Sequence, residues 1–220
     1  MLVFPRLSVE QRQQRTQVWS LGMLHCMGVQ LVVRGNPAPS GPLLMVANHM
    51  SWLDITALHA ARFCRFVSKA DIQKWPFIGV LASGTGTLFI ERESRRDAMR
   101  VVHHMTASLQ AGDVLCVFPE GTTSEGVSLL PFHANLLQAA IVANAPIQPV
   151  ALQFIDVTTG QRSAAPCYVG NDTLARSVWR TLTTPDVAVV ITFGEPQGAD
   201  GRDRRVLARA MQQAVAGLRI

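Results

Sequence analysis

One histidine and one aspartate are the residues of this chain best suited to acid–base chemistry. His49 and Asp54 lie in the segment Asn48-His49-Met50-Ser51-Trp52-Leu53-Asp54. If the chain turns between them, the carboxylate can accept a hydrogen bond from one imidazole nitrogen, which fixes the tautomer and stabilises the imidazolium. The other ring nitrogen is then free to act as a general base. The spacing therefore predicts a catalytic pair.

The group that this base would activate is expected to be a hydroxyl on a bound substrate. The chain has no Gly-x-Ser-x-Gly sequence, the usual setting of a nucleophilic serine. Ser51 is close to His49, but no triad supports it as a nucleophile. Arg92 and the loop Glu120-Gly121-Thr122 are the candidates for holding the substrate. Gly121 permits close backbone approach, and the neighbouring N–H groups can surround an anion.

Short apolar strands alternating with helix-length segments are expected to position these residues. Strands are predicted at residues 30–33, 43–47, 65–68, 87–90, 114–118, 147–154 and 187–193, and helices at 52–61, 78–82, 94–110, 133–143 and 202–218. This alternation predicts an α/β fold with a mostly parallel central sheet flanked by helices. His49, Arg92 and Glu120 each follow a predicted strand, and ligands of such sheets bind beyond the carboxyl ends of the strands.

Residues 1–34 are expected to form an N-terminal segment that contains a helix and the first strand. An α/β domain is expected to follow at residues 35–220. Its most apolar window, 18–33, is interrupted by polar residues and falls short of the roughly 20 residues of a membrane span. It can lie on a membrane surface with Trp19 as an interfacial anchor, or form a buried helix followed by a strand. Both can hold at once. No signal peptide is expected at the N-terminus.

The composition indicates a folded domain and is compatible with an anionic partner. Hydrophobic residues make up 48% of the chain, charged residues 16%, and the net charge is +5. A basic chain suits nucleic acid, a membrane surface or an anionic substrate. Nucleic acid is disfavoured because no binding motif is recognisable and aromatic residues make up only 6%. The four scattered cysteines predict buried thiols in a reducing compartment. His59 is expected on a helix surface, and no metal site is predicted.

Four blocks along the chain, taken together, resemble the glycerolipid acyltransferase family, which includes 1-acylglycerol-3-phosphate acyltransferases. The blocks are Asn48-His49-x4-Asp54, Gly86-Thr87-Leu88-Phe89-Ile90-Glu91-Arg92, Phe118-Pro119-Glu120-Gly121-Thr122 and Pro146-Ile147-Gln148-Pro149-Val150. They occur in order over about residues 40–155, and the third block is the most specific by itself.

The resemblance implies an O-acyltransferase that moves a fatty acyl chain from acyl-CoA or acyl-carrier protein to the hydroxyl of a lysolipid. The expected acceptor is 1-acylglycerol-3-phosphate, which gives phosphatidic acid. His49 would deprotonate the acceptor hydroxyl, and Asp54 would orient His49. Arg92 would contact the acceptor's phosphate, and Lys69 is a further candidate for that contact. The loop of Glu120, Gly121 and Thr122 would shape the acceptor site.

The same resemblance implies no metal and no bound organic cofactor, because the acyl donor is itself a substrate. The enzyme is expected at the cytoplasmic face of the membrane, either peripheral or interfacially anchored.

Two departures from the family pattern bear on the acceptor. Many members carry Arg where this chain has Thr123, and Lys where it has His133. Both changes remove a cation near the expected head group. The Glu-Gly-Thr-Thr sequence also resembles lyso-ornithine lipid acyltransferases, so a lyso-ornithine lipid is the alternative acceptor. A non-enzymatic basic lipid-binding module is a distant alternative, because it leaves the combination of His49, Asp54 and Glu120 unexplained.

Overall fold

A seven-stranded sheet forms the centre of the protein in the computed structural model, which describes residues 7–74, 78–90 and 95–219. The strands are β1 (Val29–Arg34), β2 (Leu43–Ala47), β3 (Arg65–Lys69), β4 (Leu88–Ile90), β5 (Val114–Val117), β6 (Ile147–Asp156) and β7 (Val187–Phe193). Their order across the sheet is β1-β7-β6-β2-β5-β3-β4. The strands β6, β2, β5, β3 and β4 run parallel to one another. β7 is antiparallel to β6, and β1 is parallel to β7. The prediction of a mostly parallel sheet is therefore confirmed.

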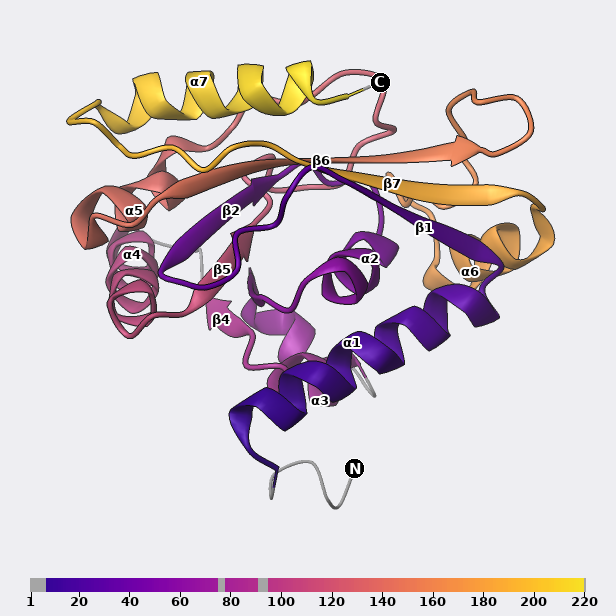
Figure 1. Ribbon diagram of the computed structural model, residues 1–220, viewed down its shortest axis with the longest axis horizontal. Coiled ribbons are helices and arrows are strands. Elements are labelled where there is room, and N and C mark those ends of the chain that lie inside the picture. Colours follow the sequence, from indigo (N-terminus) through magenta and orange to yellow (C-terminus); the bar gives the residue numbers. More distant parts are fainter. Residues whose placement is uncertain (1–6, 75–77, 91–94, 220) are drawn as a thin grey trace.

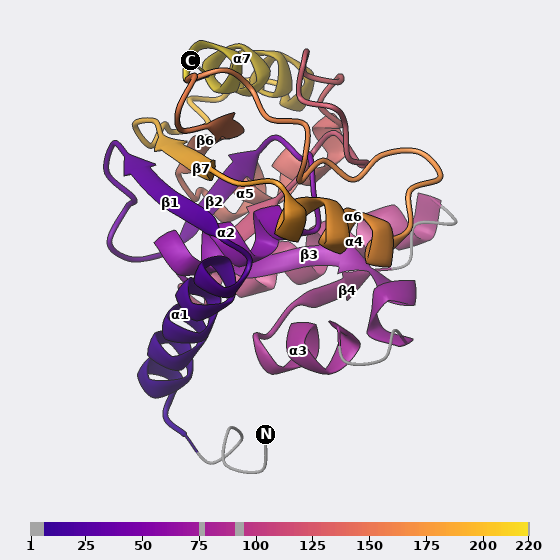
Figure 2. The same ribbon diagram turned by 90° about the vertical axis from the view of Figure 1, so that its right-hand side faces the viewer.

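Helices cover both faces of this sheet (Figures 1 and 2). They are α1 (Val9–Cys26), α2 (Leu53–Ala61), α3 (Ile78–Gly84), α4 (Arg95–Gln110), α5 (Gln138–Ala143), α6 (Leu174–Thr183) and α7 (Arg204–Gly217), with short 3-10 helices η2 (Ala70–Lys74) and η3 (Ala134–Leu137). One hydrophobic core lies between the sheet and α1 and α2, with α6 at its edge. A second core lies between the opposite face and α4, α5 and α7. The central strand β2 is buried along its whole length because both faces are covered.

The N-terminal helix begins before the apolar window that the sequence suggested. Ser8 and Gln11 form a capping box that starts α1 at Val9. One face of the helix, with Thr16, Ser20 and Leu24, is buried and packs toward α2. Within the described residues, no helix has the length and apolar character needed to cross a membrane. The strand that follows, β1, pairs with β7 and so belongs to the same sheet as the rest of the chain.

Several elements differ from the expectations. The predicted helix at 133–143 starts as η3 and becomes α-helical only at Gln138. Helix α6, whose N-cap is Thr173, was not among the predicted helices. The expectation of a surface position for His59 was wrong, because α2 lies between sheet and α1 and buries that imidazole. Cys26 is exposed, whereas the other three cysteines are buried as predicted.

Candidate active site

His49 and Asp54 meet at the carboxyl edge of the sheet. His49 follows β2, and Asp54 lies in the first turn of α2. The Nδ1 atom of His49 is 2.8 Å from the Oδ2 atom of Asp54. The sequence placed these two residues together, and the structure brings them into direct hydrogen-bond contact. The carboxylate therefore holds the imidazole in one orientation.

Asp54 also fixes the backbone of the turn between the two residues. Its Oδ2 atom accepts hydrogen bonds from the backbone N–H groups of Met50, at 2.6 Å, and Ser51, at 2.8 Å. The side chain is fully buried, and its second oxygen, Oδ1, has no hydrogen-bond partner among the described residues. A buried carboxylate with three donors on one oxygen is well suited to stabilise a positive charge on His49.

The other ring nitrogen of His49 is available to a substrate. His49 Nε2 makes no hydrogen bond to the described residues, and 18% of the side chain is exposed. One face of the imidazole stacks on Phe118, with ring centroids 4.0 Å apart and an angle of 11° between the planes. Phe118 stacks in turn on Phe66. The ring is thus held by a carboxylate at one edge and by an aromatic face, while Nε2 stays free to take a proton.

Glu120 supports the same loop from the neighbouring strand, β5. Its Oε1 atom accepts a hydrogen bond from the backbone N–H of His49, and its Oε2 atom accepts one from Leu130, each at 2.8 Å. Burial raises the pKa of the Glu120 carboxyl above its usual value, although the two backbone donors oppose that shift. Both carboxylate oxygens are therefore engaged by the chain, and Glu120 can shape the acceptor site through the backbone that it holds.

The loop after Glu120 is tied to His49 and packs beside His133. Gly121 has a φ of 74°, and a Cβ atom there would lie 3.1 Å from the ring of His133. The backbone conformation therefore favours glycine, and a side chain here would also crowd the imidazole of His133. Thr122 is exposed. The backbone N–H of Ser124 donates to the carbonyl of His49 at 2.9 Å, which ties this loop to the catalytic turn.

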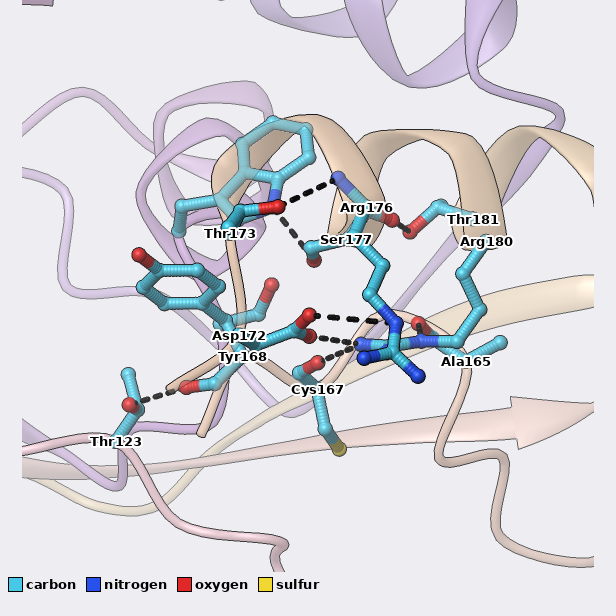
Figure 3. A network of polar contacts seen from close by, with 12 residues as sticks. Thr123, Ala165, Cys167, Tyr168, Asp172, Thr173, Arg176, Ser177, Arg180 and Thr181 are labelled. Carbon is cyan, nitrogen blue, oxygen red and sulfur yellow. Dashed lines mark hydrogen bonds and ion pairs between the residues drawn. The ribbon is translucent and has the colours of Figure 1, made fainter. Parts of the chain in front are cut away.

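Thr123 does not stand free in the site. Its hydroxyl donates a hydrogen bond to the backbone carbonyl of Tyr168, and the backbone N–H of Tyr168 donates to the carbonyl of Met50 at 2.8 Å. Figure 3 shows the segment around Tyr168 held by Arg180. The Arg180 guanidinium donates to the carbonyl of Ala165 at 2.7 Å and pairs with a carboxylate, Asp172, at 2.9 Å. Thr123 therefore anchors a chain segment at the position where many family members carry Arg.

Lys69, another predicted site residue, lies toward the edge of the sheet. Lys69 is exposed at the end of β3, where it is paired with Ile90, the last residue of β4. Arg92 lies outside the described residues.

Two buried side chains near this site, Cys167 and Asn48, are not suited to act as nucleophiles. Burial raises the pKa of the Cys167 thiol to about 11, so at neutral pH it remains protonated and is a poor nucleophile. Asn48 forms two hydrogen bonds to the backbone of Leu152 in β6, at 3.0 and 2.8 Å.

In the part of the chain that is described, no group of three or more His, Cys, Asp or Glu residues is placed to bind a metal.

Sequence reasoning missed the stacking of Phe118 and the backbone roles of Asn48 and Glu120. Phe118 ends an apolar run, and nothing in the sequence distinguishes a ring that packs on a catalytic histidine from one that packs in the core. Asn48 carries a clearer signal, because an amide next to a fully apolar strand must find partners if it is buried.

Comparison with known proteins identifies the family of this chain. Residues 30–153 match the protein family described as Acyltransferase. The chain belongs to the acyltransferase family. The match to this acyltransferase family covers His49, Asp54 and the Glu120 loop.

Two relatives of this acyltransferase align over most of its length. It is 39% identical to a lyso-ornithine lipid O-acyltransferase of Pseudomonas aeruginosa over 96% of the chain and 81% of the relative. It is 37% identical to a 1-acyl-sn-glycerol-3-phosphate acyltransferase of Neisseria meningitidis serogroup B over 88% of the chain and 76% of the relative.

The fold of this acyltransferase is also found in a solved structure. It matches the crystal structure of the 1-acyl-sn-glycerophosphate acyltransferase PlsC from Thermotoga maritima with a TM-score of 0.71 and 20% sequence identity. The match covers 94% of the chain and 78% of the solved structure. At this identity the likeness supports the α/β fold.

Proposed function

We propose that this protein transfers a fatty acyl chain from an acyl thioester to the hydroxyl group of a lysolipid. The observation that carries the proposal is the hydrogen bond of 2.8 Å between His49 Nδ1 and the buried Asp54 carboxylate, which leaves His49 Nε2 free at the carboxyl edge of the sheet. Two relatives that align with most of the chain are named as lysolipid acyltransferases, and this supports the same reaction.

The proposed mechanism uses His49 first as a base and then as an acid. Nε2 removes the proton from the acceptor hydroxyl while the hydroxyl oxygen attacks the carbonyl carbon of the thioester. Asp54 stabilises the imidazolium that forms. The tetrahedral intermediate collapses, the carbon–sulfur bond breaks, and the imidazolium returns the proton to the leaving thiolate. The products are the ester and a free thiol.

This cycle balances with an acyl thioester as co-substrate, such as acyl-CoA or acyl-carrier protein, and with no resident cofactor. Activity is therefore expected to survive dialysis against EDTA, and a loss that added metal restores would contradict this part of the proposal.

The proposed acceptor is 1-acylglycerol-3-phosphate, with a lyso-ornithine lipid as the second candidate. Lys69, exposed next to the strand that leads to Arg92, favours a phosphate-bearing head group. Thr123 favours the second candidate, because its hydroxyl is bound to the Tyr168 carbonyl and supplies no cation. The relatives include both kinds of enzyme.

A paired assay tests the reaction and the acceptor together. The wild-type protein, His49→Ala and the control His103→Ala are supplied with lysophosphatidic acid and, separately, with lyso-ornithine lipid. His103 is exposed on α4. We expect His49→Ala to abolish transfer and His103→Ala to match the wild type. Turnover retained in His49→Ala would refute the mechanism. Loss of activity in Arg92→Ala with only the phosphate-bearing acceptor would support the first acceptor.

We also propose that the enzyme works at the cytoplasmic face of a membrane, where its lipid acceptor resides. Apolar side chains of α1 are exposed, including Val18 at 64% and Trp19 at 47%. An aromatic anchor beside apolar residues is typical of a helix that lies in the interface. The substitution Trp19→Glu is expected to weaken sedimentation with anionic vesicles. The control Val206→Glu, on the exposed side of α7, is expected to leave it unchanged. Equal binding by both variants would contradict the proposal.

A further inference from the structure

An arginine-lined groove lies on the far side of the loop that supports the active site. It has a volume of about 250 Å³ and is open to solvent between α7 and residues 131–134. Its lining includes Phe132 from the loop and Arg205, Arg209 and Gln212 from α7. Figure 1 shows α7 lying across the face of the sheet opposite α1 and α2.

The charges of this groove are unpaired. Arg205 and Arg209 are exposed and lie one helical turn apart, so they share one side of α7. Neither guanidinium has an ion-pair partner among the described residues. The groove therefore presents two positive charges to any molecule that enters it.

Arg205 lies at the end of α7 where a cation is unfavourable for the helix, whereas Arg209 lies one turn further along. The first turn of α7 holds Arg204 and Arg205 and no acidic residue. Because the helix dipole is positive at this end, a cation in the first turn is unfavourable, although the N-cap carboxylate of Asp203 offsets part of this. The helix dipole therefore gives no reason for an arginine at position 205, whereas a negatively charged partner does.

The groove is coupled to the catalytic histidine through three successive hydrogen bonds. The Gln212 side chain donates from Nε2 to the carbonyl of Leu130 at 2.8 Å. The N–H of Leu130 donates to Glu120 Oε2, and Glu120 Oε1 accepts from the N–H of His49. The adjoining His133 N–H donates to the carbonyl of Pro119 at 2.8 Å. A molecule bound in the groove thus lies against the loop that positions His49.

We propose that this groove docks the acidic surface of a carrier protein that delivers the acyl thioester. The inference rests on the proposed acyl transfer and names the donor. Carboxylates one turn apart on a helix of the partner match the spacing of Arg205 and Arg209. A nucleotide such as CoA is less well matched, because its base needs an exposed aromatic face and Phe132 is only 9% exposed. The docked carrier places its thioester arm next to the Glu120 loop.

Donor-specific kinetics test the proposal with the full-length protein. The variant Arg205→Glu/Arg209→Glu is compared with wild type and with the charge-matched control Arg15→Glu/Arg34→Glu, whose residues are exposed on α1 and β1. Each is assayed with acyl-carrier protein and with acyl-CoA carrying the same chain, using a detergent-dispersed acceptor. We expect the groove variant to raise KM for acyl-carrier protein by about tenfold or more with little change in kcat.

Three further readouts separate docking from a folding defect. Acyl-CoA kinetics of the groove variant are expected to stay close to those of the wild type. The variant Arg205→Lys/Arg209→Lys is expected to keep the wild-type KM for acyl-carrier protein, because surface docking needs charge rather than a particular geometry. Added salt is expected to raise the wild-type KM for acyl-carrier protein and to leave that of the groove variant nearly constant.

Two outcomes would overturn the docking proposal. One is an unchanged KM for acyl-carrier protein in the groove variant. The other is an equal loss with both donors, which would indicate either distortion of the Leu130 loop or a site for CoA. A wild-type protein that transfers acyl chains from neither donor would instead contradict the proposed function itself.

Discussion

Replacing Asp54 by Asn removes one charge from the catalytic pair while it preserves most of its geometry. The Oδ2 atom of Asp54 accepts hydrogen bonds from the N–H groups of Met50 and Ser51. These donors require an oxygen at that position, so the Asn side chain is expected to place its carbonyl there and its NH2 group where Oδ1 now lies. His49 Nδ1–H can still donate to that oxygen. The tautomer is therefore retained, and the negative charge is lost.

The magnitude follows from the charge that develops on His49 in the transition state. With Nδ1 and Oδ2 2.8 Å apart, the centres of the two charged groups are about 4 Å apart. At an effective dielectric constant of about 20, a pair at this separation interacts by about 4 kcal/mol. Loss of that stabilisation corresponds to a decrease in kcat of about 10³-fold. Because Oδ1 has no partner, the buried NH2 group should also cost about 1–3 kcal/mol of folding stability.

Steady-state transfer kinetics with both substrates saturating give kcat for wild type, Asp54→Asn, His49→Ala and the double variant. If Asp54 acts through His49, the double variant should be no slower than His49→Ala alone. Circular dichroism and urea unfolding check that each variant is folded. A folded Asp54→Asn variant within about tenfold of the wild-type kcat would refute the electrostatic role assigned to Asp54. Additive losses in the double variant would show that the two residues act independently.

Two further substitutions test other parts of the site, and one tests the buried histidine of α2. Burial lowers the pKa of His59 to about 4, so the unfolded chain takes up a proton first as pH falls, and native stability declines below about pH 6.5. Between about pH 7 and pH 4.5 the free energy of unfolding should therefore fall by about 2 kcal/mol more in wild type than in His59→Phe. The same decrease in both proteins, measured by urea unfolding at each pH, would contradict this. Glu120→Gln leaves a backbone N–H facing an amide NH2. We expect the free energy of unfolding to fall by about 1–3 kcal/mol and kcat to decrease. An unchanged kcat would show that Glu120 does not position His49 for the reaction. Asn48→Ala leaves the N–H and C=O of Leu152 unpaired, and thermal unfolding should show a loss of about 2–4 kcal/mol that the exposed Asn135→Ala does not.

The strands were predictable from the sequence because burial on both faces leaves continuous apolar runs. The run Leu43–Ala47 is β2 without any change of bounds, and Val187–Phe193 is β7. The order of the strands was not predictable, since it depends on pairings between distant segments. β7 inserts between β1 and β6, and no local pattern in the sequence indicates that.

The helices that were missed or begun too late share a physical feature. α6 buries Ser177 and Thr181, and the first half of α1 buries Thr16 where an apolar residue is expected. A hydroxyl can occupy such a position when it donates to the carbonyl one turn earlier, as Thr16 does to Arg12 at 2.9 Å. Thr181 makes the same bond to Ser177. In α1 the buried face carries polar residues, so a search for apolar periodicity does not find its first half, whereas α6 repeats Leu174, Val178 and Leu182 at helical spacing and could have been predicted.

The site was predictable to the extent that it depends on a short turn. Five positions separate His49 from Asp54, and a strand that leads into a helix is sufficient to bring them together. What the rest of the site does depends on tertiary contacts. Glu120 was expected to shape the acceptor site, yet its two oxygens accept from backbone N–H groups of His49 and Leu130. Such a role can be seen only when the directions of the N–H groups are known.

These contacts explain why blocks far apart in the sequence must occur together. The backbone groups around the catalytic histidine are paired one by one with distant segments: His49 N–H with Glu120, His49 C=O with Ser124, and Met50 C=O with Tyr168. Asp54 takes the N–H groups of the next two residues. A histidine whose backbone is fixed at each of these points approaches the substrate hydroxyl without a search among conformations, and that reduces the entropy lost in the transition state. Disturbing any one of these pairings should therefore lower kcat more than it raises KM, because substrate still binds while the imidazole no longer points at it.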